Sequence, residues 1–183
     1  MMTRHATRLI LAGVLPALFL GGCSVDVREE EQGDRKRVDI RTPVGGMRVN
    51  TNVDTPATGL AVYPGARPRQ DGDEPRSADV DISASVFGVR VLAAKFTSDD
   101  APGDIVDFYR KELGAYGRVT ECKGNIDFRG RRDSEEVVCK PKLASRSIQL
   151  VAGTKERHRL VSIEPRRGGS EVAVVYIQTR GEG

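Results

Sequence analysis

Residues 89–114, VRVLAAKFTSDDAPGDIVDFYRKELG, contain the clearest secondary-structure signals of the chain. The first part carries apolar side chains on both faces of an extended backbone, which predicts a central strand. Asp99 or Asp100 then offers a helix N-cap, followed by a proline in the first turn. Apolar residues recur at helical spacing, namely Ile105, Phe108, Tyr109 and Leu113. The segment therefore predicts a buried strand and an amphipathic helix that ends at Gly114 or Gly117.

Five β-rich segments follow this helix and are joined by short polar stretches. They are residues 118–123, 135–140, 146–153, 159–164 and 171–179. A helix followed by consecutive strands with tight turns is typical of an α+β layer. We therefore expect an α+β fold, an antiparallel β-sheet meander with one amphipathic helix packed on it, over residues 59–183.

The region before this domain divides into two parts. Residues 23–37 are charge-dense and nearly free of large apolar groups, so we expect a solvated tether there. Alternating residues on both sides of Gly45-Gly46 predict a β-hairpin, which with its following loop occupies residues 38–58. The pattern leaves open whether this hairpin packs on the main domain.

The first 22 residues have the plan of a secretory signal peptide. Two arginines precede an apolar run over residues 9–20, which is too short to span a bilayer as a helix. The segment ends Leu20-Gly21-Gly22-Cys23, which resembles the lipobox of bacterial lipoproteins. The resemblance implies cleavage before Cys23 and acylation of its thiol, for example with palmitate. Ser24 follows, and a non-acidic residue there implies the outer membrane and a periplasmic domain. An ordinary signal peptide, or a cytosolic start with a chance cysteine, is the alternative.

Composition excludes two broad classes of protein. With 30% charged residues the chain is not a polytopic membrane protein. The formal net charge of +3 is too small to indicate nucleic-acid binding. Because two arginines lie in the signal peptide, the mature chain is nearly neutral.

Cys122 and Cys139 remain once Cys23 carries lipid. An even number of thiols in an exported protein predicts a disulfide. If the two β segments that contain them pair as a hairpin, the register sets the two cysteines opposite each other and Glu121 opposite Lys140. A redox dithiol, a metal pair and a labile regulatory bond are the alternatives, but the spacing has neither C-x-x-C nor a neighbouring histidine.

The residues that could carry catalysis or bind a metal do not form a recognisable motif. His158, the one histidine after the signal peptide, lies in a basic segment that predicts a solvated hairpin tip rather than a zinc ligand. The serines match neither G-x-S-x-G nor S-x-x-K. Asp71, Asp73 and Glu74 lack the spacing of an EF-hand, so we expect a solvated loop. The sequence therefore predicts no catalytic residues, no metal and no cofactor.

Basic residues concentrate at the predicted tips of strands. The candidate anion-binding residues are Arg129, Arg131, Arg132, Arg166 and Arg167. In a meander alternate tips fall at the same end, so we expect one cationic patch that binds phosphate or anionic headgroups. The alternative is that these arginines only keep the turns soluble.

Three short motifs, Tyr63–Ala66, Phe96–Asp100 and Phe108–Arg110, are similar to a pattern in uncharacterised bacterial envelope proteins. That resemblance implies no activity. We expect a lipid-anchored envelope lipoprotein whose domain is a non-catalytic interaction or scaffold module. Its partner would be an envelope protein or an anionic lipid, and not nucleic acid. The alternative is a periplasmic carrier that binds a small ligand or lipid, either in a groove between helix and sheet or at the arginine patch.

Overall fold

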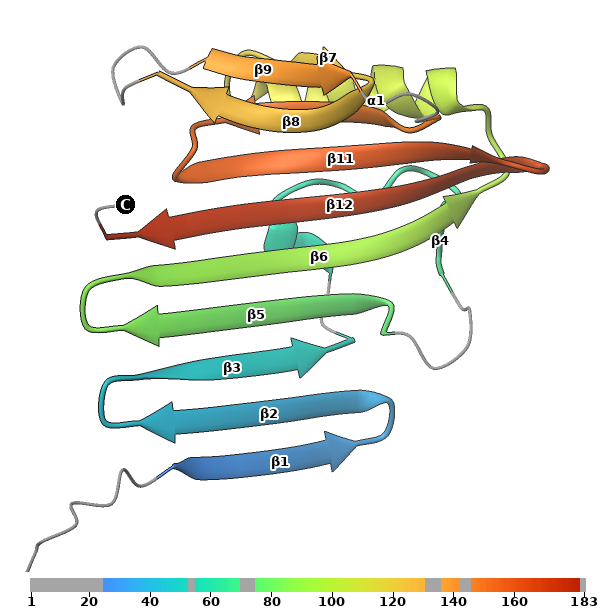
Figure 1. Cartoon of the computed structure of the whole chain (residues 1–183). Helices are drawn as coiled ribbons and strands as arrows, with labels where there is room; N and C mark the ends of the chain where they lie inside the picture. Colours follow the sequence, from blue (N-terminus) through green and yellow to red (C-terminus); the bar gives the residue numbers. More distant parts are fainter. Residues whose placement is uncertain (1–24, 53–54, 70–74, 131–135, 142–145, 182–183) are drawn as a thin grey trace, which may run out of the picture.

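The computed structural model describes residues 25–52, 55–69, 75–130, 136–141 and 146–181 (Figure 1). The elements are β1 (Asp26–Gln32), β2 (Arg35–Thr42), β3 (Gly45–Thr51), the short 3-10 helix η1 (Thr55–Thr58), β4 (Arg67–Pro68), β5 (Ser77–Ala84), β6 (Gly88–Ser98), α1 (Pro102–Gly114), β7 (Thr120–Cys122), β8 (Gly124–Arg129), β9 (Glu136–Pro141), β10 (Ile148–Gly153), β11 (Arg157–Arg166) and β12 (Gly169–Arg180).

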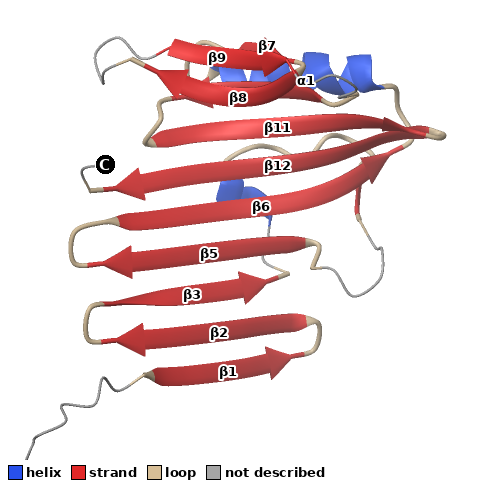
Figure 2. Cartoon of the chain, viewed as in Figure 1, coloured by secondary structure: helices blue, strands red, loops and turns tan. Residues whose placement is uncertain are grey.

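The described strands form a large antiparallel sheet and a separate β8–β9 hairpin (Figure 2). In the large sheet the order is β1-β2-β3-β5-β6-β12-β11-β10-β7, and β4 pairs with β6 off this path. The predicted sheet-rich α+β fold with one α-helix is therefore present in the described residues. The strand order differs from a single continuous meander, because β6 pairs with β12 and because β7 pairs with β10 rather than with β8. β6 and the middle of β12, residues 172–177, are largely apolar on both faces, so both belong in the middle of the sheet.

The helix α1 lies across β10 and β11 on one face of the sheet. Its buried residues are Ile105, Val106, Tyr109 and Leu113. The predicted N-cap is wrong: the N-cap residue is Ala101, which has no side-chain cap. Asp100 instead lies just outside the helix, where its N–H donates to Ser98 Oγ (3.1 Å) and its carbonyl accepts from Ser170 Oγ (2.9 Å). Two strand ends therefore hold the chain where the helix begins, and proline at the first helical position replaces a cap.

The hydrophobic core lies between α1 and the sheet. The apolar sheet residues buried on the helix side have at most 3% exposure and are Leu92, Ala94, Phe96, Leu150, Ala152, Val161, Ile163, Val172 and Val174. Tyr109 and Leu113 are fully buried against this group. Each large side chain buried in this way contributes about 1.5–3 kcal/mol, so this layer supplies most of the stability of the domain.

The expected tether is not what the structure shows for residues 26–37. β1 and the first part of β2 form a strand pair there, with the turn at Gly33 in a left-handed conformation (φ 64°). The side chains of β1 are all exposed, so backbone pairing and cross-strand charge pairs such as Lys36 Nζ–Glu31 Oε1 (3.0 Å) order the segment without apolar burial. Low apolar content therefore does not prevent this segment from becoming ordered, because backbone pairing and cross-strand charges order it instead.

The predicted hairpin around Gly45-Gly46 is the β2–β3 hairpin. Val38 faces Val49 and Ile40 faces Met47. Because β3 pairs with β5, this hairpin continues the main sheet rather than forming a separate flap. β1, β2 and β3 have no helix over them in Figure 1, so they form a single-layer extension of the sheet.

Candidate functional site

The side of the sheet opposite α1 is the most distinctive surface of the described residues, and we call it the open face. The register aligns apolar residues of neighbouring strands into two rows on it. The first row is Val27, Ile40, Met47, Ile82 and Val89. The second row is Val38, Val49, Val80, Val91 and Ile177. Paired residues of an antiparallel sheet share a face, so both rows form one continuous apolar surface.

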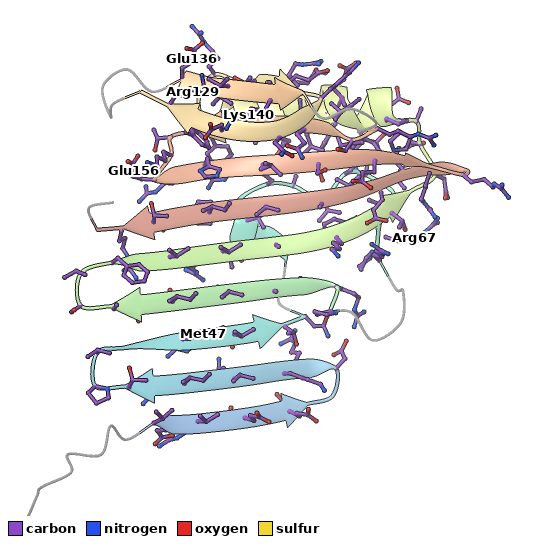
Figure 3. All side chains as sticks on the ribbon, in the orientation of Figure 1. Met47, Arg67, Arg129, Glu136, Lys140 and Glu156 are labelled. Atoms are coloured by element: carbon purple, nitrogen blue, oxygen red, sulfur yellow. A yellow bond between two sulfur atoms is a disulfide. The ribbon has the colours of Figure 1, made fainter. Side chains whose placement is uncertain are left out.

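Burial along β6 shows that no second layer covers this surface in the described part of the chain. Leu92 and Ala94 point to α1 and are buried, whereas Val91 and Ala93 between them are only half-buried. The side chains of each row shield their cross-strand neighbours, which keeps most of them half-buried without a covering element. Met47, labelled in Figure 3, is 38% exposed.

The β8–β9 hairpin covers the open face at one margin only. The Phe128 ring of β8 packs on His158 at the start of β11, with ring centroids 4.7 Å apart. The disulfide Cys122–Cys139 joins β7 at the sheet edge to β9 in the hairpin, with Cα atoms 5.4 Å apart. The hairpin therefore borders the open face, and the rows on β2, β3, β5 and β6 stay uncovered by the described elements.

The opposite face of the extension is charged. Asp39 on β2 accepts from Arg41 Nε (3.1 Å) and from Arg48 Nη2 (3.3 Å) on β3. The hydrogen bond from Arg41, joined by that from Arg48, lowers the pKa of Asp39 below its usual value. Asp79 on β5 pairs with Arg90 Nη2 on β6 at 2.9 Å. The extension is thus amphipathic, with ion pairs in water on one side and aliphatic side chains on the other.

The outer edge of the extension is acidic. β1 contributes Glu29, Glu30 and Glu31, and all of its side chains are exposed. Because side chains alternate along a strand, Glu29 and Glu31 lie on the same face as Val27. Glu29 thus places a negative charge beside the apolar rows, whereas Glu31 is paired with Lys36 of β2. Charges on an edge strand also oppose pairing between two copies of the same edge.

The predicted disulfide is present, but the predicted register is wrong. Cys139 lies opposite Ile126 in the β8–β9 hairpin, whereas Cys122 lies opposite Gln149 in the large sheet. Glu121 consequently does not face Lys140. Glu121 Oε2 accepts from Arg110 Nη2 of α1 (2.7 Å), and Lys140 Nζ pairs with Asp127 (2.6 Å). The unpredicted strand β8 pairs with β9, which moves the disulfide from within a hairpin to between two sheets.

The predicted single arginine patch does not form from the described residues. Arg129 ends β8 beside Phe128, and the Phe128 ring contacts His158, the second residue of β11. Arg166 is the last residue of the ten-residue strand β11. At 3.3 Å per residue those two ends of β11 are about 26 Å apart. Arg166 and Arg67 both pair with Asp99, and Figure 3 shows Arg67 far from Arg129. Arg167 follows Arg166 at that distant end.

The predicted lipidation site, two of the predicted patch arginines and the acidic loop residues lie outside the described residues. They are Cys23, Arg131, Arg132, Asp71, Asp73 and Glu74. Within the described ranges, no group of three or more histidine, cysteine or acidic side chains is arranged to hold a metal. No helix in those ranges is both long and apolar enough to cross a membrane.

His158 and its neighbour Arg159 have roles that the sequence did not indicate. His158 is a buried strand residue whose Nδ1 lies 3.0 Å from the carbonyl of Thr154, so the expected solvated turn position is wrong. Arg159 lies over the Tyr116 ring (3.5 Å) and near the Tyr176 ring (4.8 Å). Its Nε donates to the carbonyl of Thr58 (2.9 Å), which ties η1 to the helix-side face. The basic run KERHR gave no sign of these roles. They arise because the side chains of His158 and Arg159 point to opposite faces of β11.

Comparison with known proteins adds no relative: no protein-family model, no curated protein and no solved structure matches this chain.

Proposed function

We propose that this chain is a lipid-anchored lipoprotein of the bacterial cell envelope, whose domain is a non-catalytic interaction module. The observation that carries the proposal is the open face. Its partner would be a protein with an apolar surface and a cationic side chain along one border, which would meet the exposed Glu29 on the edge strand. Residues 20–23 support the anchor, because their pattern resembles a lipobox and lies just before β1.

The chemistry of the two sides of the extension favours this surface over the rest of the molecule. Soluble monomers rarely leave a contiguous apolar patch of several side chains in water. On the opposite face of the same strands, charged side chains are already satisfied by ion pairs such as Arg48–Asp39. A partner gains apolar burial only on the open face, and the neighbouring charges orient it. By its non-acidic Ser24 the protein would lie on the outer membrane and face the periplasm.

Site-specific photo-crosslinking in envelopes of the native host tests this proposal. Benzoylphenylalanine replaces Val80 on the open face in one variant and its neighbour Asp81, on the charged face, in the matched control. We expect a discrete protein adduct from position 80 and none from position 81. Val49→Asp, which places a charge in the second apolar row, should abolish the adduct. Adducts that are equal at both positions, or that survive Val49→Asp, would contradict the proposal.

The alternative, a carrier of a small ligand or lipid, is less favoured by the packing. The expected groove between helix and sheet is filled by Ile105, Tyr109 and Leu113, which have no exposed surface. A ligand would therefore have to lie on the open face. In the crosslinking experiment an adduct at position 80 of small-molecule mass would favour the carrier over the interaction module.

A further inference from the structure

Several turns meet at one end of the sheet, which we call the anchor end. The outermost row that crosses all the strands from β1 to β12 there joins Asp26, Arg41, Gly46, Ser83, Gly88 and Arg180, and Thr42, Gly45 and Ala84 pair one position further out. Beyond this row lie the start of β1, the β2–β3 turn and the β5–β6 turn, which Figure 1 shows on the same side of the sheet. Asp26, the first residue of β1, is three positions after Cys23.

The turns at the anchor end expose large apolar side chains. Val44 in the β2–β3 turn is 74% exposed, and Val86 and Phe87 in the β5–β6 turn are 77% and 48% exposed. Val25, just before β1, is also exposed. Among the exposed large apolar side chains of the described residues, every one except Val62 lies just before β1, in these two turns or in the first row of the open face. Single exposed valines are common, but this concentration at one end is not.

The turns at the opposite end of the same strands are polar. β1 and β2 are joined there by Gly33-Asp34, and β11 and β12 by Arg167-Gly168. The segment between β6 and α1 begins with the exposed residues Asp99 and Asp100. The two ends of the β1–β6 part of the sheet therefore differ in chemistry, whereas the β10–β11 turn, which also lies at the anchor end, is polar and contains Thr154, Lys155 and Glu156.

The lengths involved place the apolar turns close to the expected lipid. Three residues span at most about 10 Å from Cys23 to the start of β1. Strands are spaced about 4.8 Å apart, so the β2–β3 turn lies about 5–10 Å and the β5–β6 turn about 15–19 Å from β1 along the sheet. A bilayer that held acyl chains on Cys23 would lie within reach of Val44, Val86 and Phe87.

We propose that the anchor end is a bilayer-docking surface, with Val44, Val86 and Phe87 inserted among the lipid headgroups. This inference rests on the proposed lipid anchor and extends it from a flexible attachment to a fixed orientation. Arg180, which is exposed at the end of β12, carries a cation that suits lipid phosphates, whereas Arg41 in the same row is paired with Asp39. With its strands upright on the bilayer, the sheet would present the open face sideways to a partner in the periplasm.

Depth measurements on the acylated protein test the docking. The protein is purified from host membranes and reconstituted in vesicles of phosphatidylethanolamine and phosphatidylglycerol, with a nitroxide on Val44→Cys or, in a second variant, on Val86→Cys. The chain has three cysteines, so acylation of Cys23 and the Cys122–Cys139 disulfide leave the introduced thiol for labelling. Val62→Cys, an exposed valine elsewhere, and Arg167→Cys, at the polar end, are the matched controls.

The nitroxide collides with oxygen, which concentrates in lipid, and with a nickel chelate, which stays in water. We expect the ratio of oxygen collisions to chelate collisions to be severalfold higher at positions 44 and 86 than at positions 62 and 167. A protein that floats with the vesicles but shows the same ratio at all four positions would overturn the docking and leave the anchor intact. A protein that does not float with the vesicles would overturn the anchor, and the docking with it.

Discussion

Two adjacent valines of β12 allow a direct test of whether the open face is uncovered. Val174 points to α1 and is 1% exposed, whereas Val175 points to the open face and is only partly buried. Val174 lies opposite Ala94 and Val161, and Val175 opposite Ala93 and Leu160. We therefore compare Val174→Ala with Val175→Ala, which remove the same atoms from opposite sides of one strand.

The magnitudes follow from burial. Each substitution removes two methyl groups, and at about 0.8 kcal/mol per buried carbon the transfer loss at Val174 is about 1.6 kcal/mol. The cavity left in a packed layer raises the total at Val174 to about 2–3 kcal/mol. Val175 is mostly but not fully buried, so about two thirds of the transfer loss remains there, about 1 kcal/mol, and no closed cavity forms. The lower β propensity of alanine affects both variants alike, so it cancels in a difference of about 1.5 kcal/mol.

Equilibrium unfolding in urea, followed by circular dichroism on the purified protein with its disulfide intact, measures both losses. The m-values should agree with that of the parent chain, so that a change in midpoint reports a change in the free energy of unfolding. Equal losses for the two variants would refute the reasoning, because they would mean that the open face is as closely packed as the helix face.

Three further predictions concern the disulfide and two titratable groups. The double variant Cys122→Ala with Cys139→Ala should lose about 3 kcal/mol of unfolding free energy, because the disulfide no longer closes a loop in the unfolded chain. Its amide hydrogen exchange should speed up most in β8 and β9. Unchanged exchange in these strands would contradict the inference that the disulfide holds the hairpin on the sheet. The hydrogen bond from Arg41 lowers the pKa of Asp39 below its usual 3.8. The stability that this contact contributes is therefore present above pH 3.8 and is lost as the pH falls through the lowered pKa. In an NMR titration, Arg41→Gln should raise the pKa of Asp39. Burial raises the pKa of Tyr109 to about 12. The stability that the neutral Tyr109 contributes is therefore full below pH 10 and is lost as the pH rises through about 12. In an absorbance titration, the Tyr109→Phe variant should lack the tyrosine transition that occurs at the highest pH.

The elements with strong local patterns were predictable from the sequence. The helix over residues 102–114 was clear because its apolar residues recur at helical spacing, and the β2–β3 hairpin because alternation flanks two glycines. The Cys122–Cys139 pairing was also correct, since cysteine number and export context decide it without knowledge of the register.

Errors arose where partners distant in the chain decide the outcome. β1 has no apolar pattern of its own and becomes a strand because β2 offers it a backbone partner. β8 was missed, although it separates the two strands joined by the disulfide. The helix start was assigned to an acidic cap, but its position depends on Ser170, which β12 brings to Asp100. Local propensity contains no information on such pairings.

The helix, most of the strands and the lipobox-like segment can be read from short stretches of neighbouring residues, and the cysteine pair from the number of cysteines. Which strands are neighbours, and which face of each strand α1 covers, depend on the packing of segments that are distant in the chain. Those choices align valines of five strands into the open face, separate Arg129 from Arg166 and bring the apolar turns to one end. The physical reason is that a sheet joins residues through register between distant segments, so its surfaces exist only once the strands have paired.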